Sequence, residues 1–327
     1  MSAAARPIGR RTGRFRGGRE NDGVTTEYSG TGDPKRSMEL LWGGPERPRR
    51  GPKPRLTVAQ IARAAIEIAD AEGLTGLSMR RVADQLGVTA MSLYTYVPGK
   101  AELLDLMLDT VYGEEPEPTT AGARATDRRT TAGETAAEET RATEAGAGGR
   151  ASGGKVTGAE DWRTRLERLA RQNYARYRRH PWLLQVATSR PVLGPNLMAR
   201  WNQELAAVDG LGLTEIEMDL VVTLLGDYVH GAARAAVEAD QAEQRTGMTD
   251  EQWWYAYAPL LEQVFDVARF PVAARVGEVA GAEYRAATDP ARSFEFGLPR
   301  VLDGIEAFLR TRPATEEAAR DAAESPS

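Results

Sequence analysis

Apolar residues between positions 57 and 112 recur with the spacing of amphipathic α-helices. The first run is introduced by Thr57 and Gln60, which have the spacing of a capping box, and Gly73 is placed to end it. Two shorter runs follow, introduced by the possible N-caps Ser78 and Thr89. The pattern therefore predicts four successive helices, at about residues 57–73, 78–87, 90–96 and 100–112.

The two short helices in the middle are separated by a tight turn at Gly87, as in a helix-turn-helix. In that motif the second helix enters the major groove of DNA, and its first residues meet the edges of the bases. The alternative for Met91, within that second helix, is a place in the hydrophobic core. The base-facing positions would be Thr89, Ala90, Met91 and Ser92, with Tyr94 and Thr95 one turn later.

This stretch resembles the DNA-binding domain of the tetracycline-repressor (TetR) family. The resemblance is carried by Leu77–Ala83, Leu86–Val88, Leu93–Val97 and Lys100 with Leu103 and Leu104. It implies that Arg80 reaches a base, that Tyr94 contacts the DNA backbone or a thymine, and that Lys100 contacts a phosphate. A solvated surface charge is the alternative for Arg80 and Lys100. The full set of DNA contacts expected in the domain is Thr57, Arg80, Thr89, Ala90, Met91, Ser92, Tyr94, Thr95, Tyr96 and Lys100.

A basic arm precedes the first of these helices, so that the DNA-binding domain is expected to span residues 47–112. Three prolines and a glycine between residues 47 and 55 favour an extended backbone. Arg49, Arg50, Lys53 and Arg55 could then follow the DNA backbone or enter the minor groove. A solvated run of charge is the alternative.

The distribution of charge supports a nucleic-acid partner, although the 327-residue chain has a net charge of −5. Residues 1–56 carry 13 Lys and Arg against 6 Asp and Glu, a local charge of +7, so the remainder carries −12. A basic end on an acidic body would be steered towards DNA phosphates. The chain has no cysteine and no long apolar run, which favours a cytoplasmic protein without a membrane segment.

Three segments have compositions typical of disorder: a basic tail at 1–46, an inserted loop at 113–158 and a tail at 312–327. Arg10–Arg19 resembles an Arg/Gly-rich nucleic-acid tail, with a dispensable extension as the alternative. Glu39–Trp42 forms a short apolar island that could dock on the DNA-binding domain, at a place that the sequence does not indicate. Gly149–Lys155 resembles a phosphate-binding loop, but Val156 replaces the required Ser or Thr and no strand precedes it, so that function is rejected.

The helical period returns between residues 159 and 311, which indicates a second, helical domain. Helices are expected at about 161–180, 197–208, 215–239 and 294–309, with Pro299 inside the last one. The region 251–270 is an aromatic segment with several apolar residues, and 276–284 has no clear assignment. The fold class is therefore all-α, with an N-terminal helix-turn-helix domain and a C-terminal ligand-binding and dimerisation domain.

This second domain resembles the C-terminal domain of the tetracycline repressor itself. The resemblance is carried by Asp161-Trp162, His180–Trp182, Ser189–Pro191 and Gly194–Asn196 in that order. It implies a homodimer held by a four-helix bundle, formed by the helices at 215–239 and 294–309 of each subunit. Close helix approach would be allowed by small residues, although an alanine stripe packed within one subunit is the alternative: Ala232, Ala233, Ala235 and Ala236.

Catalytic and metal-binding patterns are missing from the sequence. His180 and His230 are the only histidines, and they lack the spacing of a metal site, so structural roles are expected for both. No nucleophile motif or carboxylate pair indicates an enzyme, and no cofactor is expected.

The effector site is expected to differ from that of the tetracycline branch, which holds its drug as a Mg²⁺ chelate through histidines. Val186 occupies the place of one such histidine, and Tyr112–Glu114 offers no replacement for the other. A largely apolar pocket for a small hydrophobic organic molecule, bound without metal, is therefore expected, with a closed core as the alternative. The residues expected to line it are Leu169, Asn173, Tyr174, Val186, Arg190, Trp201 and Tyr228.

These observations predict a ligand-responsive transcriptional regulator, most often a repressor in this family. It would bind a pseudo-palindromic operator as a homodimer and be released by a small molecule. The alternative is a general nucleic-acid-binding or architectural protein without effector control.

Overall fold

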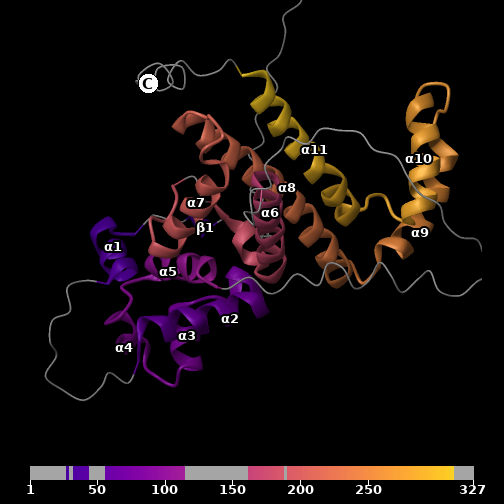
Figure 1. Cartoon of the computed structure of the whole chain (residues 1–327). Helices are drawn as coiled ribbons and strands as arrows, with labels where there is room; N and C mark the ends of the chain where they lie inside the picture. The colour runs from indigo at the N-terminus through magenta and orange to yellow at the C-terminus, as the bar shows by residue number, and fades with distance from the viewer. Residues whose placement is uncertain (1–26, 29–31, 44–55, 115–160, 188–189, 313–327) are drawn as a thin grey trace, which may run out of the picture.

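The protein is all-helical in the described parts of the chain, apart from one pair of two-residue strands (Figure 1). The computed structural model describes residues 27–28, 32–43, 56–114, 161–187 and 190–312. The N-terminal helices form a head at one end, and the later helices form a second bundle beside it. None of the helices in these ranges is long and apolar enough to span a bilayer.

The head consists of α2 (Val58–Gly76), α3 (Met79–Gln85), α4 (Ala90–Tyr94) and α5 (Lys100–Tyr112). The predicted capping box is present at the start of α2, where the side chain of Thr57 accepts from the amide of Gln60 and the Gln60 side chain accepts from that of Thr57. Gly73 interrupts the helical backbone of α2 with φ 71°, a left-handed conformation that favours glycine. The four predicted helices are therefore confirmed, with α4 ending two residues early.

The second bundle is built from α6 (Trp162–Arg179), α7 (Pro195–Val208), α8 (Glu215–Thr246) and α11 (Pro290–Thr311), with a 3₁₀ turn η1 (Pro181–Gln185) after α6. Leucine, valine, isoleucine, alanine and phenylalanine side chains from α6, α7, α8 and α11 form its core. Tyr174 stacks on Phe294 with ring centroids 4.0 Å apart. Pro299 is accommodated inside α11. The predicted helices are confirmed here, and α8 continues beyond the expected end until Gly247 adopts φ 71°.

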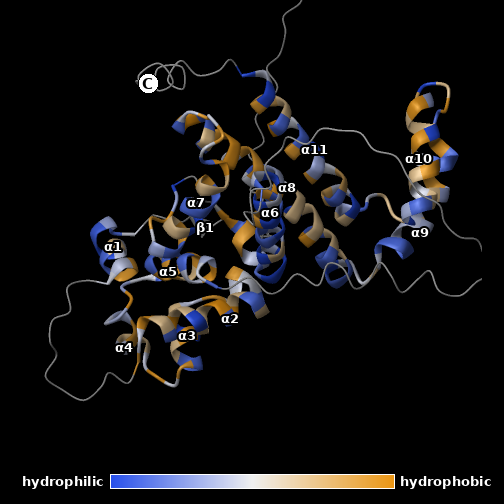
Figure 2. Cartoon of the chain, viewed as in Figure 1, coloured by the Kyte–Doolittle hydropathy of each residue, from blue (hydrophilic) through white to orange (hydrophobic). Residues whose placement is uncertain are grey.

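The aromatic segment after α8 forms two helices that stand away from the bundle (Figure 1). They are α9 (Asp250–Val264) and α10 (Pro271–Tyr284). Many apolar side chains of both helices are exposed, and no residue of α9 is buried. Figure 2 shows hydrophobic residues in orange along both helices. An exposed apolar surface of this extent is typical of a face that another molecule covers.

The expectation of disorder throughout residues 1–46 is wrong for α1 (Pro34–Trp42), which lies against α5. The side chain of Asp33 caps this helix by accepting from the amide of Arg36, and Leu40 and Leu41 pack on the core of the head. Ser37 donates to Asp105 of α5 at 3.1 Å. The expectation rested on the average composition of residues 1–46, which does not reveal a short amphipathic helix that tertiary contacts stabilise.

Two further segments differ from the expectation of disorder. Strand β1 (Glu27–Tyr28) pairs in parallel with β2 (Val186–Ala187). Gly113 caps the end of α5, and Glu114 contacts His180, so the residues assigned to the start of the inserted loop are structured. The remainder of that loop, the phosphate-loop-like motif and the Arg/Gly-rich tail lie outside the described residues.

Candidate functional sites

Helix α4 presents the side chains that the helix-turn-helix motif requires. Thr89 caps it by accepting from the amide of Ser92, and Leu93 is fully buried and fixes the helix on the head. Met91 is 78% exposed, which excludes the core alternative for this residue. Tyr94 is 46% exposed, so its ring and hydroxyl are accessible one turn further along the same helix. The exposed face of α4 can therefore enter a groove without rearranging the core.

The other residues predicted to contact DNA fall into three groups. Thr57 and Arg80 are exposed at the N-terminal ends of α2 and α3, and Thr95 is exposed at the C-terminal end of α4. Tyr96 and Lys100 are half-buried, and Ala90 is half-buried at the start of α4. The arm residues lie outside the described part of the chain: Arg49, Arg50, Lys53 and Arg55. DNA contact by all of these residues stays a prediction.

His180 joins the head to the second bundle. Its buried imidazole lies between two carboxylates, with Nδ1 2.8 Å from Asp70 of α2 and Nε2 3.1 Å from Glu114 after α5. Trp182 donates from its indole to the same oxygen of Asp70 at 2.8 Å. Both ring nitrogens are thus engaged, as expected for a structural histidine.

Asp109 makes a second joint between the head and the bundle. Its carboxylate accepts from the backbone amides of Asn196 and Leu197 and from the side-chain amide of Asn196, each at 3.0 Å. It thereby binds the first turn of α7, where unpaired amides and the helix dipole favour a negative charge. Burial raises the pKa of Asp109, although these hydrogen bonds act in the opposite direction.

A cavity of about 540 Å³ lies among α6, α7, α8 and the loop before α7, and we call it the effector cavity. Three of the seven residues predicted to form the effector site line it: Leu169, Asn173 and Trp201. Several other lining residues were not predicted from the sequence. They lie on the same faces of α6 and α7 as Leu169, Asn173 and Trp201: Tyr177, Leu197, Met198, Arg200 and Glu204. The helical spacing of Leu197 and Trp201 is the signal that could have located the face of α7.

The other four predicted effector residues lie elsewhere. Tyr174 stacks on Phe294, and the Tyr228 hydroxyl donates to the Phe294 carbonyl at 2.8 Å, so both aromatic rings face α11. Val186 is buried in the core that η1 shares with the head, and Arg190 is exposed. The resemblance indicates which helix or loop lies near the cavity. The rotation of that helix about its own axis then decides which of its side chains face the cavity.

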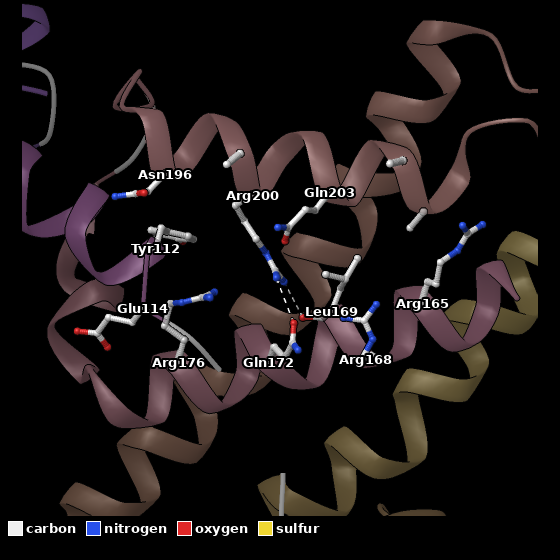
Figure 3. A pocket seen from close by; sticks show the side chains of 14 residues that line it. Tyr112, Glu114, Arg165, Arg168, Leu169, Gln172, Arg176, Asn196, Arg200 and Gln203 are labelled. Carbon is white, nitrogen blue, oxygen red and sulfur yellow. Dashed lines mark hydrogen bonds between the residues drawn. The ribbon is translucent and has the colours of Figure 1, made fainter. Parts of the chain in front are cut away.

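A second cavity of about 620 Å³ lies on the other side of the contact between α6 and α7, and we call it the arginine cavity (Figure 3). Tyr112, Leu169 and Arg200 line both cavities and so form the wall between them. Arg200 is only 7% exposed, and its guanidinium donates to Glu204 at 2.9 Å, to Gln172 at 3.2 Å and to the Leu169 carbonyl at 2.9 Å.

No cluster of three or more metal-ligating side chains occurs among the described residues.

Comparison with known proteins identifies the family. Residues 56–107 match the model of bacterial regulatory proteins of the tetR family, and residues 156–309 match that of the tetracyclin repressor-like C-terminal domain. The chain is 43% identical over 289 residues to the HTH-type transcriptional repressor DrrR1 of Streptomyces coeruleorubidus, covering 88% of this chain and 91% of that protein. The chain belongs to the TetR family.

Other TetR-family relatives agree with this assignment. An HTH-type transcriptional regulator of Saccharopolyspora erythraea is 29% identical over 228 residues, covering 69% of this chain and 80% of that one. The structure of ActR from Streptomyces coelicolor in complex with actinorhodin superposes with a TM-score of 0.52 and 25% identity, covering 78% of this chain and 99% of that one. The chain is therefore a DNA-binding helix-turn-helix repressor, from a family of regulators and not of enzymes.

Proposed function

We propose that this TetR-family repressor is a homodimer that a small organic molecule releases from a pseudo-palindromic operator. The observation that carries the proposal is the position of Tyr112, which is the last residue of α5 and also lines the effector cavity. A ligand in this cavity would therefore contact α5, the last helix of the head. Filling the cavity can therefore favour a head position that no longer fits DNA, by population shift.

A second copy of the chain is the partner that best explains the exposed apolar stripe on α8 and α11. Ile216 of α8 is 71% exposed and Phe296 of α11 is 64% exposed, and Leu220 and Leu224 continue the stripe along α8. Gly231 and Ala235 follow at helical spacing on α8 and are exposed, which would let two helices approach closely.

The same geometry refines the predicted dimer contacts. Ala233 and Ala236 are buried inside the subunit, which supports the alternative of intrasubunit packing for these two. Ala235 is exposed and Ala232 is half-buried. The proposed four-helix bundle therefore uses Ala235 and the larger apolar residues of the exposed stripe.

The effector is proposed to be a largely hydrophobic organic molecule bound without metal. Leu166, Val222, Leu225 and Val229 line the effector cavity, and its volume is suited to a compound of drug size. ActR, which has the same fold, has been solved in complex with actinorhodin, and that compound is the first candidate to test. Calorimetric titration with tetracycline, with Mg²⁺ or EDTA, tests the metal-free mode, which tight Mg²⁺-dependent binding would contradict.

Footprinting and one substitution test the DNA-binding mode. A dimer should protect two half-sites about 34–36 Å apart on one face of the DNA. Tyr94→Ala should weaken operator binding roughly tenfold or more while leaving the dimer and its melting temperature unchanged. Uniform, salt-sensitive coating of any DNA would instead favour the general nucleic-acid-binding alternative.

A further inference from the structure

The arginine cavity has an unusual charge. Arg165, Arg168 and Arg176 of α6 and Arg200 of α7 line it, with Gln172, Asn196 and Gln203 as neutral polar neighbours (Figure 3). Residues 165, 168, 172 and 176 are three or four apart, so they form one stripe of α6 that faces α7. The effector cavity lies on the adjoining stripe of the same helix.

Among the described residues, no carboxylate forms an ion pair with Arg165 or Arg176. Glu114 is the only acidic side chain of the described residues that lines the cavity, and its Oε2 lies 3.1 Å from His180 and 3.8 Å from Arg179. Figure 3 shows the Glu114 side chain directed away from the arginines. Arg200 is already paired with Glu204 at 2.9 Å, so the charges that lack a carboxylate partner in the described structure are those of Arg165 and Arg176.

The guanidinium of Arg176 is held by neutral groups. Arg176 donates to the side-chain oxygen of Asn173 and lies over the ring of Tyr112, with its central carbon 4.9 Å from the ring centroid. Burial and the neighbouring Arg200 lower the pKa of Arg176, which shows that its positive charge is unfavourably placed. The Nε of Arg165 is buried without a hydrogen-bond partner in the described structure.

A cationic cavity of this kind is suited to an anion. Guanidiniums stay protonated at neutral pH, and their planar N–H groups bind carboxylates by paired, charge-assisted hydrogen bonds. An anion would neutralise charge that is now partly desolvated, and its gain is larger here than at an exposed surface. The volume of about 620 Å³ accommodates an organic molecule and not merely a small ion.

We propose that the arginine cavity is a second ligand site, which binds an organic carboxylate through Arg165 and Arg176. It is separate from the effector cavity and does not depend on the proposed effector. Because Tyr112 and Arg200 belong to both cavities, occupation of one changes the wall of the other. A second, acidic metabolite bound at this site can therefore also regulate the same repressor.

Calorimetric titration with two probes of the same shape tests the charge requirement. The probes are 2-naphthoate and its neutral amide, 2-naphthamide, and the protein is the full chain. The carboxylate should bind at least tenfold more tightly than the amide, with an affinity that falls as salt is added. Equal affinities of the two probes would overturn the proposal. Inorganic phosphate is a third probe, and binding of phosphate without 2-naphthoate would show a site for small ions and overturn the organic class.

Substitutions locate the site. Arg176→Gln should lower the affinity for 2-naphthoate about tenfold or more without changing that for 2-naphthamide, and Arg165→Gln gives a second variant in case the first does not fold. Arg178→Gln is the matched control, because Arg178 is on the same helix but pairs with Asp240 outside the cavity. An equal loss with Arg178→Gln would show that only the overall charge matters and would overturn the proposal.

A variant of the other cavity separates this inference from the proposed effector. Trp201 lines the effector cavity only, so Trp201→Ala should leave 2-naphthoate binding unchanged. Loss of 2-naphthoate binding in that variant would place the probe in the effector cavity and contradict the second site. The effector proposal would be unaffected by that result, since it is judged by release of DNA.

Discussion

Replacement of His180 by alanine tests whether the buried histidine fixes the head on the bundle. The substitution removes hydrogen bonds to Asp70 at 2.8 Å and Glu114 at 3.1 Å, and it leaves a cavity where a buried ring was. Each hydrogen bond of this kind contributes about 1 kcal/mol, and the lost packing adds a similar amount. The two carboxylates are about one-third exposed, so solvent screening reduces their share.

We therefore expect His180→Ala to lower the free energy of unfolding by about 2–4 kcal/mol. Urea unfolding followed by circular dichroism measures this, with the His230→Ala variant as control. His230 is half-buried and contacts the Tyr177 ring edge-on at 5.5 Å, so a smaller loss is expected there.

A double-mutant cycle separates the energy of the His180–Asp70 hydrogen bond from the packing lost when the imidazole ring is removed. Asp70→Asn and His180→Ala should couple by about 1 kcal/mol, because each removes the partner of the other. Additive losses, or a His180 variant as stable as the His230 variant, would refute the bridging role of the imidazole.

Three smaller predictions follow from other contacts. Ser78→Ala should cost about 1 kcal/mol of stability, because Ser78 caps α3 through the amide of Arg81, whereas Ser78→Asp should retain the cap; thermal unfolding compares the two. Trp42→Phe removes the indole donor that binds the Leu193 carbonyl at 2.7 Å, so amide exchange in α1 should accelerate while exchange in α2 stays unchanged; equal rates in wild type and variant would exclude an anchoring role. Because burial raises the pKa of Asp109, its ionised form is the less favourable one in the fold, and wild type should gain stability relative to Asp109→Asn as the pH falls from neutral through that raised pKa. Unfolding free energies of both proteins between pH 7 and the onset of acid unfolding measure this, and a constant or opposite difference contradicts it.

The head could be predicted from sequence because its determinants are local. The caps Thr57, Ser78 and Thr89 each bond to a residue three positions away, and the apolar period fixes the buried face of every helix. The α1 helix could not be predicted in this way. Its stability depends on Asp105 and Leu193, which lie far from it in the sequence.

The residues that line the effector cavity could be predicted only in part from the sequence. Leu169 and Asn173 were expected in it from the position of α6, and they line it. Tyr174 follows directly after Asn173 but faces α11, because one residue turns a helix by about 100°. The arginine stripe was overlooked since solvated arginines and cavity-lining arginines have the same spacing, and only the position of α7 distinguishes them.

Helix α5 shows how polar side chains fix the relation between the head and the rest of the chain. Glu102, Asp105 and Asp109 are buried on it, although sequence analysis considered only its apolar face. Burying carboxylates is unfavourable unless donors satisfy them, and here the donors come from different elements. The backbone and Ser37 of the α1 segment bind Glu102 and Asp105, while the start of α7 binds Asp109. Apolar contacts are not directional and alone would allow α5 to shift along its axis. The hydrogen bonds are directional and hold α5 in one position. The start of α7 is therefore bonded directly to α5, the last helix of the DNA-binding head.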